Sequence, residues 1–320
     1  MPAGYSGACA ISDHHTIQPE MASIPQREYH EILRDLEDLE SYLTSLGLHR
    51  VDEDRLRGVI ANIKELEKAR AENRLLAFNT DPRVAELVWS LVEGQELAEI
   101  FQGIRGYDPH IVKRLMQRAL KGPLHPLHET ISSNIGRNTM FELMLAARFR
   151  RGGADVALGR RADVVIAHAG SRLYIECKRP LYGHTVERNV KKARQQLRQR
   201  FDSDPHPDST AGLVAISIAK TVNPGSNWLM VDEADDLEQQ LSNDMSRIHG
   251  LYASDYDCQI DPRLIGMLYH IITPAYLRKS GLLVAASQIA IVLHSKSLNT
   301  VFPVSGDALK HLLQRLKPSS

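Results

Sequence analysis

Three charged side chains stand where the sequence predicts two neighbouring strands, and together they could bind a divalent cation. Asp163 lies in the apolar run 162–166, and Glu176 and Lys178 close the run that ends Tyr-Ile-Glu-Cys-Lys. Side chains of a strand alternate between its faces, so Glu176 and Lys178 project together while Cys177 points the other way. Charged groups in a sheet core cost desolvation free energy unless they are paired or bind a metal. Because converging carboxylates repel each other, a cation with oxygen ligands would stabilise Asp163 beside Glu176.

A fourth candidate, Glu142, lies on a segment that is predicted to be helical. It is the single acidic residue of 138–150, where apolar side chains form one face and arginines flank it. A helix packed across the sheet would aim Glu142 at the two strand carboxylates. The sequence also leaves open a simpler alternative, in which the strand charges form a cross-strand salt bridge on an exposed sheet face.

The order of these residues along the chain is specific. A helix glutamate is followed by a strand aspartate, then by Glu-x-Lys, and then by a basic helix. This order resembles the PD-(D/E)xK nuclease superfamily. In the resemblance Asp163 is the motif aspartate, Glu176-Cys177-Lys178 is the (D/E)xK sequence, and Glu142 matches the glutamate that many members place on the helix before the core.

The resemblance covers about residues 137–220. It implies an α/β (α+β) fold with a restriction-endonuclease-like αβββαβ core, in which 212–219 is the fourth strand. Two features depart from the family pattern. Ala162 replaces the proline before the motif aspartate, and neither Gln195 nor Gln196 has a tyrosine four residues later. The RecB-like branch, which has Gln-x-x-x-Tyr on this helix, is therefore not indicated.

The resemblance also implies a mechanism. Asp163, Glu176 and the backbone carbonyl of Cys177 would hold Mg²⁺ or Mn²⁺ against a scissile phosphate. Lys178 would orient the attacking water or help to deprotonate it, and would offset negative charge in the transition state. Glu142 would bind a water of this metal ion or help to hold a second ion.

The distribution of charge favours a polyanionic partner. Among nucleic acids DNA is the favoured expectation, although charge does not separate it from RNA. The chain carries 39 Lys and Arg against 39 Asp and Glu, but residues 137–201 contain 15 basic and 5 acidic residues, so this segment has a net charge of +10. A local basic field attracts nucleic acid whatever the total charge. The residues expected to contact the phosphate backbone are Arg160, Arg161, Arg179, Lys191, Lys192 and Arg194. The alternative is that these cations lie on solvated helix faces.

The elements that must position the site are predicted in two parts. Residues 26–122 form an all-helical module that begins with an antiparallel hairpin, since leucine and isoleucine recur every three or four residues over 32–46 and 56–66. Residues 130–320 form the α/β nuclease domain with a C-terminal extension, and 1–25 form a flexible arm. The module is expected to pack separately from the nuclease domain. The sequence leaves open whether this helical module binds a protein partner or a second copy of the chain.

Within the second part, apolar runs and turn residues locate the individual elements. Strands are predicted at 155–158, 162–167, 172–177 and 212–219, and helices at 138–150, 186–201, 232–248 and 306–316. Two long apolar runs, 264–272 and 282–294, are left without an assigned element. The segment GPLHPLHETISSNIGR, which breaks the helical pattern, marks the boundary between the two parts.

Several classes of protein are excluded or disfavoured. No apolar run approaches the ~18 residues of a membrane-spanning helix, and the first residues lack the features of a secretory signal. Three widely spaced cysteines argue against a disulfide scaffold or a zinc ribbon, so a cytoplasmic location is expected. Serine-hydrolase and nucleotide-binding motifs are also missing from the sequence.

The sequence therefore predicts a Mg²⁺- or Mn²⁺-dependent phosphodiesterase that hydrolyses nucleic acid. A role in bacterial defence or repair would fit such an enzyme. The alternative is a catalytically inactive nucleic-acid-binding or assembly protein that retains the nuclease fold.

Overall fold

The computed structural model describes residues 14–17, 27–48, 54–81, 83–158, 162–168, 171–206, 209–252 and 261–294. Its α-helices are α1 (Tyr29–Ser45), α2 (Asp54–Ala71), α3 (Val84–Ile104), α4 (Pro109–Ala119), α5 (Ile135–Arg151), α6 (Val186–Ser203), α7 (Ala219–Val222) and α8 (Ala234–Tyr252). Its strands are β1 (His14–Ile17), β2 (Asp155–Leu158), β3 (Val164–His168), β4 (Ser171–Lys178), β5 (Thr210–Ser217), β6 (Leu229–Val231), β7 (Leu264–Leu277) and β8 (Leu282–His294). None of these helices combines the length and the apolar character that crossing a membrane requires.

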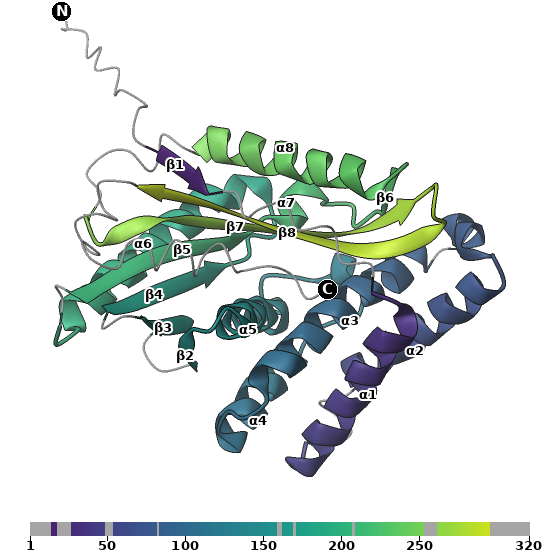
Figure 1. The fold of residues 1–320 in the computed structure, drawn as a ribbon, viewed down its shortest axis with the longest axis horizontal. Coiled ribbons are helices and arrows are strands. Elements are labelled where there is room, and N and C mark those ends of the chain that lie inside the picture. Colours follow the sequence, from purple (N-terminus) through teal and green to yellow (C-terminus); the bar gives the residue numbers. More distant parts are fainter. Residues whose placement is uncertain are drawn as a thin grey trace, which may run out of the picture.

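The fold is mixed α/β, and one sheet organises it (Figure 1). The strands follow the order β1-β8-β7-β5-β4-β3-β2, and β6 pairs separately with β7. Strands β2, β3 and β4 are antiparallel, β4, β5 and β7 are parallel, and β7 and β8 are antiparallel again. The predicted succession of helix, three strands, helix and strand is present as α5, β2, β3, β4, α6 and β5.

Helices cover both faces of the sheet, which explains why the central strands are buried throughout and mostly apolar. Every residue of β5 and β7 is buried, as expected for strands with a covered face on each side. One apolar cluster joins α1 to α5 with one face of the sheet, and a second joins α6 and α8 with the other face. The residues of the expected C-terminal extension belong to the same sheet, because β7 pairs with β5 and β8 pairs with β7.

The helical hairpin forms where the periodicity predicts it. Leu36, Leu39 and Leu43 form a fully buried stripe along α1, and the side chain of Glu31 accepts a hydrogen bond from the backbone N–H of Glu28 in a capping box. Shortly after α1 ends, Gly47 adopts a φ of 72°, a conformation that glycine reaches without strain. The apolar stripes of this hairpin are buried within the chain itself.

The expected separate packing of the helical module is not observed. Its buried residues share one core with the sheet, and α3 is buried on nearly every side because it lies between the hairpin and β7–β8 (Figure 1). The indole N–H of Trp89 donates to the carbonyl of Ser226 at 2.6 Å, and the hydroxyl of Tyr29 donates to the carbonyl of Leu283 at 2.9 Å. These bonds connect the module to the α/β part.

The expected flexible arm needs revision, and one predicted helix falls outside the described residues. Residues 14–17 of the expected flexible arm form β1, which pairs with β8 in antiparallel register. The edge of β8 offers unpaired backbone groups, and a short strand can satisfy them. The predicted helix at 306–316 lies outside the described residues.

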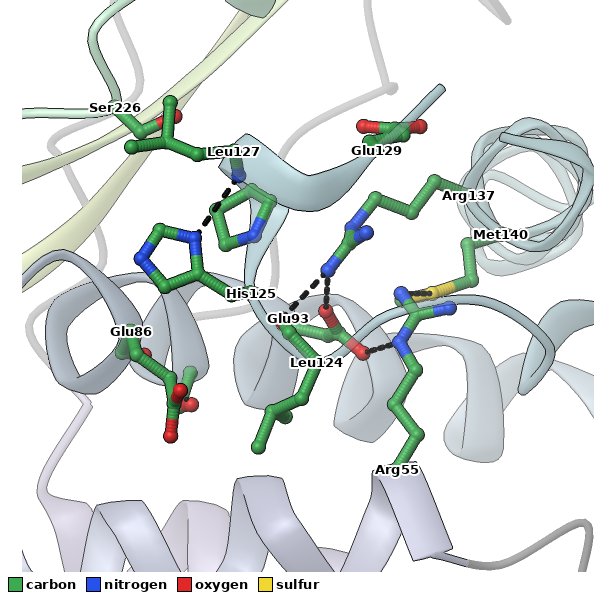
Figure 2. Close-up of polar contacts among 12 residues, drawn as sticks. Arg55, Glu86, Glu93, Leu124, His125, Leu127, Glu129, Arg137, Met140 and Ser226 are labelled. Carbon is green, nitrogen blue, oxygen red and sulfur yellow. Dashed lines mark hydrogen bonds and ion pairs between the residues drawn. The ribbon is translucent and has the colours of Figure 1, made fainter. Parts of the chain in front are cut away.

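Buried ion pairs fasten α5 to α3. Glu93 of α3 pairs with Arg55 of α2 and with Arg137 of α5, whose Nη2 also donates to the carbonyl of Leu124 at 2.9 Å (Figure 2). Six residues after Glu93 on α3, Glu99 accepts two hydrogen bonds of 2.9 Å from Arg148, which lies near the end of α5.

We predict that Glu93→Gln will lower the free energy of unfolding by about 3–5 kcal/mol. The substitution leaves two buried guanidinium groups without a charge partner, and an uncompensated buried charge has this typical cost. Glu65→Gln is the matched control, because the Glu65–Arg83 pair is exposed and should contribute only about 0–1 kcal/mol. Urea unfolding measures both, and equal losses would contradict the structural role of Glu93.

Candidate functional site

The pairing of β3 with β4 brings the two predicted strand carboxylates together. Val164 pairs with Ile175 in antiparallel register, so Asp163, one residue before β3, lies opposite Glu176. The Asp163 Oδ2 atom accepts a hydrogen bond of 2.8 Å from the backbone N–H of Cys177. This bond fixes the aspartate at the end of the strand that carries Glu-x-Lys.

The Lys178 ammonium lies against all three oxygens that were predicted to bind a metal. Its Nζ is 3.1 Å from the carbonyl oxygen of Cys177, 3.5 Å from Glu176 Oε2 and 3.8 Å from Asp163 Oδ2. Two carboxylates and a carbonyl therefore converge on one positive charge. Only 1% of the Glu176 side chain is exposed, which contradicts the alternative of a salt bridge on an exposed sheet face.

Glu142 approaches this cluster from α5. It lines the same cavity as Asp163 and Lys178. Burial, followed by repulsion from Asp163, raises the pKa of Glu142 to about 8. The same two causes, in the same order, raise the pKa of Glu176 to about 7. The cluster therefore holds protons near neutral pH, where ordinary carboxyl groups are ionised.

Cys177 has a structural side chain, as the strand alternation predicts. Its thiol is buried in the apolar core that faces α5, and burial raises its pKa well above the ordinary value. The hydrogen bonds of this residue to the charged cluster come from its backbone, through the N–H to Asp163 and the carbonyl to Lys178.

The donor set suits a hard divalent cation of the magnesium class. No group of three or more His, Cys, Asp or Glu side chains that could hold a metal occurs among the described residues. Mg²⁺, however, typically binds one or two carboxylates and keeps several waters or substrate phosphates as its other ligands. Asp163, Glu176 and the Cys177 carbonyl satisfy that requirement. In addition, Glu176 Oε1 is buried without a hydrogen-bond partner, although Arg200 Nε lies 3.7 Å away.

The cluster opens into a cavity of about 550 Å³ with a basic rim. Three exposed cations line it: Arg118 of α4, and Arg188 and Lys192 of α6. Amide side chains line it as well, namely Asn134, Asn138, Asn189 and Gln196. A negatively charged ligand with polar edges fits this lining.

The predicted backbone-contact residues have different locations. Lys192 lines the cavity, whereas its neighbour Lys191 is exposed outside it and pairs with Glu187. Arg194 lies on α6 and does not line the cavity, and Arg160 and Arg161 lie outside the described residues. Arg179 lines the cavity, but its guanidinium forms a buried ion pair with Glu129. Because this ion pair holds the guanidinium of Arg179 in the protein interior, we do not expect Arg179 to contact a phosphate.

Two basic residues of the rim were not selected from the sequence. Arg188 precedes Lys192 by four residues, so helical spacing could have grouped the two on one face. Arg118 belongs to the helical module, and nothing in the sequence connects α4 with a site 45 residues later.

Comparison of the chain with protein-family models, with curated proteins and with solved structures gave no match. The functional interpretation therefore depends on the geometry described above.

The raised carboxyl pKa values predict how stability changes with pH in metal-free protein. Because the folded state holds these protons more tightly than the unfolded state, stability should fall as the pH rises from about 4.5 towards 8. We expect Glu142→Gln, which removes the ionisable group, to raise the Tm at pH 8 by about 2 °C or more, on a scale of roughly 2 °C per kcal/mol. At pH 5 the substitution should have little effect.

Scanning calorimetry in chelator at pH 5 and pH 8 checks this prediction. A Glu142→Gln variant that loses the same stability at both pH values would show that this carboxyl group is not held in a repulsive cluster.

Proposed function

We propose that this protein is a metal-dependent nuclease of the PD-(D/E)xK type, with DNA as the favoured substrate. The observation that carries the proposal is the convergence of Asp163, Glu176 and the Cys177 carbonyl on a single cationic centre. The centre lies at a cavity with a basic rim. The succession of α5, β2, β3, β4, α6 and β5 supports it, because it follows the order of the restriction-endonuclease-like core.

Each residue of the cluster would have a distinct role in phosphodiester hydrolysis. Asp163, Glu176 and the Cys177 carbonyl would hold Mg²⁺ or Mn²⁺, which when bound polarises the phosphoryl oxygen and stabilises the leaving oxyanion. Lys178 would orient the attacking water and offset negative charge on the phosphate. Glu142, with a pKa of about 8 in the metal-free protein, would hold or accept a proton at the solvent side of the cluster.

One observation favours a second candidate function. The Lys178 ammonium contacts the metal-binding oxygens itself, so the carboxylates have a charge partner without any metal. A catalytically inactive protein that retains the fold would keep this arrangement and bind nucleic acid through the rim.

Substitutions at Lys178 and Glu176 separate the two functions. Lys178→Ala leaves both carboxylates, so the protein should still bind Mn²⁺, while cleavage should fall by about 10²-fold or more, which is typical for loss of a positioned catalytic group. Glu176→Gln keeps the side-chain shape but removes a ligand charge, so both metal affinity and cleavage should fall. Cleavage of plasmid, linear DNA and RNA is measured with Mg²⁺, with Mn²⁺ and with chelator. Metal binding by the same variants is measured by calorimetry.

The control for this experiment is Lys191→Ala, which removes an exposed lysine outside the cavity. Wild-type protein that binds no divalent ion and cuts none of the substrates would leave the inactive binding protein as the function. Full activity of Lys178→Ala would reject the role assigned to the lysine.

The rim makes a separate prediction about binding. Lys192→Ala should weaken nucleic-acid binding and reduce the slope of log K against log salt by about 0.9 on duplex, the value for one lost phosphate contact. Lys191→Ala changes the next residue of the same helix but not the cavity lining, and should leave the slope unchanged. Equal slopes for the two variants would show that the α6 face at the cavity does not meet the phosphates. Fluorescence anisotropy over a salt series gives both slopes.

A further inference from the structure

Exposed apolar side chains gather at the cavity that contains the charged cluster. Ile131 is 75% exposed and Tyr182 is 51% exposed, and both line the cavity. Large apolar groups that face water beside convergent polar groups are characteristic of ligand sites. The ligand should therefore have an apolar face in addition to negative charge.

The Tyr182 ring is held in place as a platform. The backbone carbonyl of Tyr182 accepts hydrogen bonds from the backbone N–H of Thr185 at 3.0 Å and from its hydroxyl at 2.7 Å. The ring stacks on His184, with 5.5 Å between centroids and 8° between planes. Leu181, the preceding residue, is buried. An aromatic ring on an ordered turn loses little conformational entropy when a second ring stacks on it.

The surroundings of Tyr182 match the other parts of a nucleotide. The ring follows Lys178 by only four residues, so it lies on the segment that leaves the charged cluster. Arg188 and Lys192 supply positive charge from α6. Asn189 between them supplies an amide, whose Nδ2 donates to the Thr185 carbonyl at 2.8 Å and whose oxygen is the group that can accept from a ligand. Cations for a phosphate, an amide for a base edge and an aromatic face for stacking thus line one cavity.

The geometry points to an unpaired nucleotide as the occupant of this cavity, with its base stacked on Tyr182 and its phosphate at the Lys178 cluster. A paired duplex covers the faces of its bases by stacking and presents phosphates and groove edges instead, so it cannot use the exposed ring. Combined aromatic platforms and basic grooves are how proteins bind single strands. This inference rests on the proposed function and narrows its substrate class to a single strand or an unpaired end.

Binding in the absence of metal tests the inference without cleavage. Wild type, Tyr182→Ala and Tyr182→Phe are titrated, in chelator, against single-stranded DNA, single-stranded RNA and duplex DNA of one sequence. Tyr182→Ala should weaken single-strand binding about 5-fold to 100-fold, the range expected for loss of one base–aromatic stack, and change duplex binding less than about twofold. Tyr182→Phe keeps the ring and should bind as wild type does. Leu251→Ala, which removes an exposed apolar side chain from α8, is the control for surface hydrophobicity.

A fluorescent purine placed at successive positions of the single strand gives a second readout. Its emission should be quenched at one position by wild type and not by Tyr182→Ala. The inference is overturned if Tyr182→Ala binds the single strand as tightly as wild type, or if it loses single-strand and duplex binding equally. Failure of cleavage with every metal would overturn the proposed nuclease activity while leaving the binding result intact. Metal-dependent cutting of duplex DNA alone, at the same rate in wild type and Tyr182→Ala, would overturn the inference of an unpaired nucleotide while leaving the proposed nuclease activity intact.

Discussion

The position of Glu142 beside the charged cluster depends on the buried ion pairs between α3 and α5. Arg137 near the start of α5 and Arg148 near its end are held by Glu93 and Glu99 of α3. A helix fixed at both ends can neither slide nor rotate about its axis, so the direction of Glu142 between them is determined. The anchor extends into the sheet, because Arg148 also donates to the Ser287 hydroxyl at 2.8 Å. The helical part of the chain is therefore a scaffold for the site and also contributes Arg118 to its rim.

The second constraint is the register of β3 on β4, which places Asp163 opposite Glu176. This arrangement is costly in the absence of a metal, since burial and mutual repulsion raise the pKa of both Glu142 and Glu176. A cluster selected for stability alone would give each carboxylate its own cation or replace these groups by apolar residues, whereas here one lysine faces both strand carboxylates. Strongly shifted pKa values of neighbouring carboxyl groups beside a cavity are typical of functional sites.

Much of this arrangement could be predicted from local sequence. Strand alternation placed Glu176 and Lys178 on one face and Cys177 in the core, and helical periodicity located α1, α2 and α5 to within a few residues. The rest of the helical module was predicted only as helical, and sequence periodicity could not show the burial of α3, because a helix that is buried on nearly every side has no distinct apolar stripe.

Other features depend on contacts between distant segments, to which local patterns are insensitive. The pairing of β1 with β8 and the presence of β7 beside β5 are long-range backbone interactions. Arg179 has the charge of a phosphate ligand, but its pairing with Glu129 some 50 residues earlier removes it from that role. Tyr182 carried no recognisable signal in the sequence, because its exposure and its place at the cavity emerge only from the fold.

The most direct test of the account is calorimetric titration of Mn²⁺ into the wild-type protein at pH 6.5, in two buffers that differ in ionisation enthalpy. If Asp163 and Glu176 hold the metal within a cluster that retains protons at this pH, binding should release about one proton per ion, and the apparent enthalpy should differ between the buffers accordingly. Asp163→Asn should abolish or greatly weaken the binding. Absence of binding by wild type, or binding that is unchanged in Asp163→Asn, would contradict the assignment of this cluster as a metal site.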